Sequence, residues 1–166
     1  GPESFKPNDL LTLYRSRTHV LGDLVNSQPV YVQTPFAEYA DTGYESFKAS
    51  KATRTGMVYV GGNDGMLHAF AAADGKEKWA FVPSLVLPTL HKLADYNYAS
   101  NHKYYVDGTP IVSDVYDTSG TPAWKSILVG GLNKGGKGYY ALDVTDPDSP
   151  KGLWEFGWSD TCWAVT

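Results

Sequence analysis

The sequence predicts an all-β fold built from two successive four-stranded antiparallel units. Short runs rich in β-branched and aromatic residues alternate with turn residues along the chain. The 17 glycines and 10 prolines mark the ends of these runs, because both residue types favour the backbone angles that turns require. A hydrophobic content of 42%, with five tryptophans and twelve tyrosines, is sufficient for a packed core and argues against disorder.

The first unit shows its strands most clearly. Met57–Val60 is apolar and typical of a buried strand, and Gly61–Gly65 supplies a turn. A second strand is predicted at Met66–Ala72. Asp74-Gly75 is a two-residue hairpin signal, after which Lys76–Val82 forms a third strand that carries a tryptophan and a phenylalanine. A proline-led run upstream adds the fourth strand.

The second unit repeats the first in the same order. The matching segments are Gln28–Val32 with Thr109–Ser113, Val58–Gly62 with Ile127–Gly131, Leu67–Ala71 with Tyr139–Asp143, and Lys78–Phe81 with Leu153–Phe156. Four strands with short turns, repeated, are typical of the blades of a β-propeller. The chain is therefore predicted to be a β-propeller fragment of about two four-stranded antiparallel blades with one short interblade helix.

The chain is expected to divide into six parts. These are a tag scar at 1–2, an N-terminal lead-in at 3–27, blade 1 at 28–83 with a long loop at 34–55, a connector at 84–108, blade 2 at 109–157, and the truncated start of a next segment at 158–166. The loop is long enough to carry a short helix of its own. In the connector, Leu87, Leu90 and Leu93 recur at helical spacing and Pro88 suits a first turn, which predicts a helix at about 88–95 that packs its leucines on the sheet.

Charge and length argue against two classes of partner. The net charge is −4 and no basic run is present, so binding to nucleic acid or to anionic lipid is poorly supported. No stretch approaches the roughly 18 apolar residues of a transmembrane segment.

Cys162 is the only cysteine. In a cytosolic protein it would be an ordinary thiol, whereas in an exported protein an odd cysteine predicts a disulfide partner outside these residues.

Two aromatic segments are candidates for protein contact. They are the loop 34–55 and the connector around 96–105, and the candidate residues are Phe36, Tyr39, Tyr44, Phe47, Tyr96 and Tyr98. The alternative for the loop is structural, because aromatic side chains in a long loop more often pin it onto the body of the protein.

Candidates for chemistry are few. Asp143, Asp146 and Asp148 are dense enough for a weak oxygen-ligand metal site, but a turn in which aspartates bond nearby backbone N–H groups explains them equally well. Asn63-Asp64-Gly65 is sufficient as a tight turn. The four histidines show no zinc-ligand spacing, and His68, on a strand, is interpreted as structural. The sequence contains neither a phosphate-binding loop motif nor the G-x-S-x-G nucleophile elbow of hydrolases. No residue is therefore a catalytic or cofactor-binding candidate.

Several motifs together resemble a known family. They are Gly22–Pro29, Val58–Phe70, Tyr105–Pro110, Leu128–Gly131 and Gly135–Pro147, within a similarity that covers roughly Arg17 to Phe156. They resemble the C-terminal propeller of the PilY/PilC type IV pilus assembly proteins. At Ala71 the family usually has aspartate, and its D-x-D-x-[DN] calcium loop is absent from this sequence. The resemblance therefore implies calcium only for the full-length family, and for no residue of this sequence.

The resemblance implies an exported, non-enzymatic bacterial protein at the pilus tip, on the cell surface or in the periplasm. Its role would be pilus assembly, retraction control and hence twitching motility, or adhesion. The implied partners are minor pilins, other pilus-tip proteins and host surfaces.

Two alternatives share the blade pattern. The spacing V-Y-V-G-x-x-D-G-x-L-x-A also resembles a quinoprotein dehydrogenase that uses pyrroloquinoline quinone, and the scaffold propeller of an outer-membrane assembly lipoprotein. The dehydrogenase needs a calcium shell and an aspartate base that this sequence does not show.

Two blades alone would leave sheet faces uncovered. Loops must therefore cap these faces, strands must swap, or the chain must associate with itself.

Overall fold

The computed structural model describes residues 14–15 and 19–157 and contains two four-stranded antiparallel sheets. The first sheet has the order β1 (Val30–Val32), β2 (Met57–Gly61), β3 (Leu67–Ala71), β4 (Glu77–Phe81). The second has the order β5 (Ile111–Asp117), β6 (Ala123–Gly131), β7 (Gly138–Asp143), β8 (Lys151–Gly157). The predicted all-β fold with two blades in chain order is confirmed. The segment predicted at 158–166, with Cys162, lies outside the described residues.

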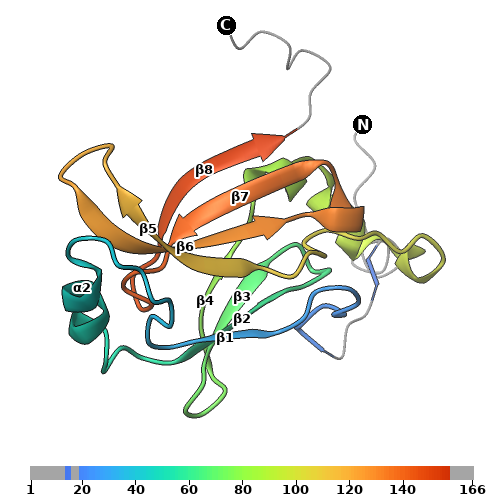
Figure 1. Ribbon diagram of the computed structural model, residues 1–166. Helices are drawn as coiled ribbons and strands as arrows, with labels where there is room; N and C mark the ends of the chain where they lie inside the picture. The colour runs from blue at the N-terminus through green and yellow to red at the C-terminus, as the bar shows by residue number, and fades with distance from the viewer. Residues whose placement is uncertain (1–13, 16–18, 158–166) are drawn as a thin grey trace, which may run out of the picture.

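The two sheets stack face to face, and the core lies between them (Figure 1). Tyr59 and Leu67 of the first sheet and Leu128, Tyr140 and Leu142 of the second are almost completely buried in one apolar cluster. Burial of apolar surface at about 25 cal/mol per Å² is the main force that holds such layers together. Because this cluster joins the sheets, the two blades form one packed body.

Each sheet has an irregularity at the same place. The register shifts after Ala69 in the β3–β4 pair and after Ala141 in the β7–β8 pair, and each alanine lies opposite a tryptophan, Trp79 or Trp154. Tyr59 pairs with Ala69 as Val129 pairs with Ala141.

The structure corrects one detail of the repeat. By this register Gly61 corresponds to Gly131, so the sequence alignment of the two Gly-Gly pairs was wrong by one residue. The alignment followed the glycines, whereas the hydrogen-bonded register sets which residues share a face.

Tight turns join β2 to β3 and β3 to β4 in the first sheet. The φ angle is +93° at Gly65 and +70° at Gly75. These left-handed conformations favour glycine, as the predicted turns require. The β3–β4 turn is closed by a hydrogen bond from the Gly75 N–H to the Ala71 carbonyl, and the Asp74 carboxylate accepts a bond from the Lys76 N–H.

The helical segments differ partly from the predictions. The loop 34–55 carries α2 (Tyr44–Ser50), as expected. The connector instead forms a 3₁₀ helix, η1 (Ser84–Ala94), that begins before Pro88 and contains it, followed by η2 (Tyr98–Ser100). Residues spaced three apart share a face of a 3₁₀ helix, and Leu90 and Leu93 pack against the core as predicted. Val86 is buried, and Leu87 is exposed.

A third 3₁₀ turn, η3 (Asn133–Gly135), lies between β6 and β7. Within the described residues, no helix is both long enough and apolar enough to cross a bilayer. In Figure 1, α2 lies at one end of the stacked sheets and the connector, in yellow-green, lies at the other end.

Candidate partner-binding surfaces

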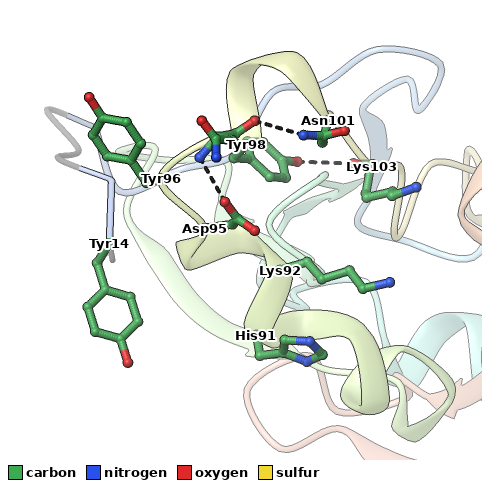
Figure 2. A pocket seen from close by; sticks show the side chains of 9 residues that line it. Tyr14, His91, Lys92, Asp95, Tyr96, Tyr98, Asn101 and Lys103 are labelled. Atoms are coloured by element: carbon green, nitrogen blue, oxygen red, sulfur yellow. Dashed lines mark hydrogen bonds between the residues drawn. The ribbon is translucent and has the colours of Figure 1, made fainter. Parts of the chain in front are cut away.

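A cleft of about 510 Å³ opens in the connector where η1 and η2 meet the N-terminal part of the chain. Figure 2 shows Tyr14 and Tyr96 at one edge of this cleft and Lys92 and Lys103 directed to the other. The full set of lining residues is Tyr14, His91, Lys92, Asp95, Tyr96, Asn97, Tyr98, Asn101 and Lys103. We call it the connector cleft. Asp95 alone among these residues is acidic, so the cleft is locally cationic in a chain of net charge −4.

Backbone contacts hold the N-terminal side of the connector cleft. The Arg15 N–H donates to the Ala94 carbonyl at 3.0 Å, and Arg15 Nε donates to the Leu93 carbonyl at 2.6 Å. The same guanidinium lies 4.1 Å from the centre of the Tyr98 ring, within cation–π range. Segments about 80 residues apart in sequence therefore build one wall, which sequence spacing alone does not reveal.

The two predicted contact tyrosines of the connector have different environments. Tyr98 is 5% exposed, and its hydroxyl donates to the Lys103 carbonyl at 3.1 Å. Tyr96 is 64% exposed. Tyr98 therefore forms the floor of the cleft, whereas the Tyr96 ring is available for contact.

The aromatic residues of the loop 34–55 gather on Trp124 of β6. Tyr39 stacks on Trp124 with ring centres 5.6 Å apart, and Tyr44 meets the Trp124 ring edge-on at 4.7 Å. Phe47 lies 6.1 Å from Tyr44. Tyr44 is fully buried, so it is removed from the set of expected contact residues. Phe36 is 80% exposed and stays a candidate, and Tyr39 is 38% exposed.

Hydrogen bonds fix this loop to the second sheet. The Tyr44 hydroxyl donates to Asp114 Oδ2 at 2.8 Å, and Trp124 Nε1 donates to the Thr42 carbonyl at 3.1 Å. Burial, together with the Asp114 carboxylate, raises the pKa of Tyr44, which keeps the hydroxyl protonated as a donor. Most aromatic residues of the loop therefore pin it onto the body of the protein, which is the structural alternative to a contact surface.

A buried polar network beneath the loop was not anticipated. Arg54 Nη1 donates to Ser126 Oγ at 2.8 Å, and Ser126 Oγ donates to Asp114 Oδ1 at 2.6 Å. Arg54 also donates from Nε to the Gln33 carbonyl. Burial lowers the pKa of Arg54 and the nearby Asp114 carboxylate opposes that shift. Nothing in the sequence pairs an arginine at the end of one loop with a serine and an aspartate of the other blade.

The three aspartates considered for a metal have protein partners. Asp143 accepts from the Thr145 N–H at 3.0 Å, and Asp146 accepts from the Asp148 N–H at 3.1 Å. Asp148 forms an ion pair with Lys78 at 3.2 Å. Among residues 14–15 and 19–157, no group of three or more histidine, cysteine or acidic side chains is arranged to hold a metal ion. These contacts are those of aspartates in turns.

The residues of the recognised motifs meet between the blades. Asp107 accepts hydrogen bonds from Asn26 N–H at 3.2 Å and from Asn26 Nδ2 at 2.7 Å. Asn63 Oδ1 accepts from the Tyr105 N–H at 3.1 Å, and its Nδ2 donates to Asp23 at 3.1 Å. The motifs therefore lock the segments that lead into β1 and β5 to each other and to the β2–β3 turn.

The family described as the PilY1 beta-propeller domain matches residues 21–162. The chain belongs to this family. The match spans both sheets and the interblade motifs.

Named relatives of the PilY1 propeller family support the assignment. A type IV pilus biogenesis factor PilY1 homolog of Xylella fastidiosa is 49% identical over 148 residues, covering 85% of this chain and 12% of the relative. The type IV pilus biogenesis factor PilY1 of Pseudomonas aeruginosa is 44% identical over 152 residues, covering 87% and 13%. The chain thus spans about an eighth of the length of these relatives.

A solved structure has the same fold. The crystal structure of the Pseudomonas aeruginosa PilY1 C-terminal domain matches with a TM-score of 0.59 and 39% identity, covering 76% of this chain and 25% of the solved chain. The two blades therefore correspond to a part of a larger propeller domain.

Proposed function

We propose that this chain is part of a type IV pilus biogenesis factor that acts by binding other proteins, without a catalytic step of its own. The observation that carries the proposal is the PilY1 propeller match over residues 21–162, together with relatives named as pilus biogenesis factors at 44–49% identity. The partners are minor pilins or other pilus-tip proteins, with host surfaces as a further contact. The protein acts after export, at the pilus tip, on the cell surface or in the periplasm, in assembly, retraction control or adhesion.

The connector cleft is the surface we propose for a pilin. Exposed Tyr96 offers an aromatic ring at one edge, and Lys92 and Lys103 offer positive charge at the other. This combination suits an acidic segment that also carries an apolar side chain, because the lysines attract the charge and the ring packs on the apolar group. Phe36, which is exposed in the loop 34–55, is the second candidate contact.

The test uses a piliated bacterium that lacks its own copy of the gene and expresses a full-length protein carrying this sequence. We expect the unaltered protein to restore surface pili and twitching motility. Lys92→Glu and Tyr96→Ala should reduce copurification of minor pilins while protein levels stay constant. The matched control is Lys76→Glu, because Lys76 lies in the exposed β3–β4 turn away from the cleft.

The outcomes separate two statements. If deletion leaves piliation and twitching unchanged, the pilus role is wrong. If deletion abolishes piliation but both cleft variants bind pilins normally, the pilus role stands and the cleft is not the contact surface. Loss of binding by Phe36→Ala alone would then assign contact to the loop.

A further inference from the structure

Two residues that precede the propeller match build one wall of the connector cleft. They are Tyr14 and Arg15, which we call the strap, and the family match begins at residue 21. Tyr14 pairs with Asp95 in an antiparallel β-bridge and is 55% exposed at the edge of the cleft (Figure 2). The strap is therefore part of the cleft although it lies outside the region that matches the propeller family.

Arg15 closes the C-terminal end of η1. The last two residues of this helix are Leu93 and Ala94. Their carbonyls accept hydrogen bonds from Arg15 Nε at 2.6 Å and from the Arg15 N–H at 3.0 Å. The last carbonyls of a helix have no partner within the helix, and a positive charge is favourable at this end. Arg15 therefore supplies both the donors and the charge that the end of η1 requires.

The residues that Arg15 holds in place lead directly into the cleft. His91 and Lys92 belong to the last turn of η1 and line the cleft. The Arg15 guanidinium also lies 4.1 Å from the centre of the ring of Tyr98, which is the buried floor. Without the strap, the last turn of η1 and the floor would lose these contacts. A partner would then have to order them on binding, which lowers its affinity.

The other end of η1 does not depend on the strap. Glu155 of β8 accepts hydrogen bonds from the Ser84 N–H at 3.0 Å and from the Ser84 hydroxyl at 2.6 Å. Leu85 packs on Gly138 and Gly157, at each of which an added Cβ would lie only 2.6 Å from a Leu85 methyl carbon. The second blade thus fixes the start of η1, and the strap fixes its end. Displacement of the strap should therefore change the cleft without unfolding the blades.

We infer that partner binding in the connector cleft is coupled to docking of the strap. The inference rests on the function proposed for this cleft. Arg15 is a positioning residue: it holds the last turn of η1 and Tyr98 in the arrangement that the partner binds. Coupling of this kind is reciprocal, so a partner that prefers the docked strap also stabilises its docking. A bound pilin thereby holds in place the segment that leads into the propeller.

The first experiment measures copurification of minor pilins with a full-length protein that carries this sequence. Arg15→Ala and Arg15→Lys should each weaken pilin binding about fivefold or more, the lower end of typical coupling between sites. Arg15→Lys is informative because lysine keeps the positive charge but loses the planar guanidinium that bonds the Leu93 carbonyl and stacks on Tyr98. The matched control is Lys76→Ala, which removes an exposed positive charge in the β3–β4 turn and should leave binding unchanged.

The second experiment measures amide hydrogen exchange in the same full-length protein. Arg15→Ala should accelerate exchange in residues 93–98 and leave exchange in β6 unchanged, because only the end of η1 and the floor lose contacts. In the unaltered protein, addition of a copurifying minor pilin should slow exchange at the Arg15 N–H as well as within the cleft.

Three results would overturn the inference. Normal pilin binding by Arg15→Lys would show that Arg15 acts through its charge alone and not by positioning the cleft. A pilin that slows exchange in residues 92–103 and leaves the Arg15 N–H unchanged would show that the cleft binds without the strap. Normal binding by both Lys92→Glu and Tyr96→Ala would remove the cleft as the pilin surface, and the coupling with it. Loss of binding in those two variants with normal binding in both Arg15 variants would reject the coupling alone.

Discussion

His68 is a buried histidine held between two carboxylates. Its Nε2 lies 3.1 Å from both oxygens of Asp64, and its Nδ1 lies 2.6 Å from Glu77 Oε1. Burial alone would lower the pKa of His68, but the hydrogen bonds to Asp64 and Glu77 outweigh burial and raise it. Burial would raise the pKa of Asp64, but the bonds from His68 and the Gly22 N–H lower it. The interpretation of His68 as structural from its strand position agrees with these contacts.

This pair predicts a pH-dependent contribution to stability. Because the folded pKa of His68 is raised, its contribution is complete below the unfolded value of about 6.5 and is lost as pH rises through the folded pKa. Because the folded pKa of Asp64 is lowered, its contribution is present above about 3.9 and is lost as pH falls through the folded value. The difference in melting temperature between the unaltered chain and His68→Gln should therefore be largest near pH 5 to 6 and shrink toward pH 9. A difference that is constant across this range would contradict the assignment.

At the scale of elements, the loop 34–55 belongs to the first blade and packs against the second. Tyr44→Ala should open a cavity beneath Trp124 and leave Asp114 without its phenol donor, at a cost of about 3 to 5 kcal/mol of unfolding free energy. Phe36→Ala, in the same loop but 80% exposed, should change stability little. Urea unfolding of both variants measures the difference. Equal stability of the two would show that the loop does not pack as described.

The elements differ in how far the sequence could predict them. Alternating apolar residues and glycine turns were enough for the strands, because both act over a few residues. The docking of Tyr44 on Trp124 joins residues 80 apart, and no local pattern encodes it. The 3₁₀ form of η1 also escaped prediction, because the leucines recur at a spacing that both helix types share. Tyr96 is exposed, as a contact residue must be, whereas Tyr98 carries the same sequence signal and is buried.

At the scale of the whole molecule, the two blades are joined by the apolar core and by polar locks at the segments that lead into them. Asp107 is 1% exposed and accepts from Asn26 on the first lead-in and from Asn133 Nδ2 at 3.3 Å near η3. The Gln28 N–H donates to Thr109 Oγ1 at 3.0 Å beside it. The bonds from Asn26 to Asp107 and from Gln28 to Thr109 join segments that are about 80 residues apart in sequence. The blades are therefore expected to unfold together in a single transition.

Removal of the Asp107 carboxylate tests this coupling. Asp107→Ala removes a buried carboxylate that accepts hydrogen bonds from the Asn26 N–H and from the side-chain amides of Asn26 and Asn133, which should cost about 1 to 3 kcal/mol of unfolding free energy. Because the lock joins both blades, amide hydrogen exchange should accelerate in β1–β4 and in β5–β8 alike. The matched control is Asp74→Ala in the exposed β3–β4 turn, where exchange in the second sheet should not change. Faster exchange confined to the second sheet in Asp107→Ala would mean that the blades unfold separately, and that the apolar core alone does not make them one cooperative unit.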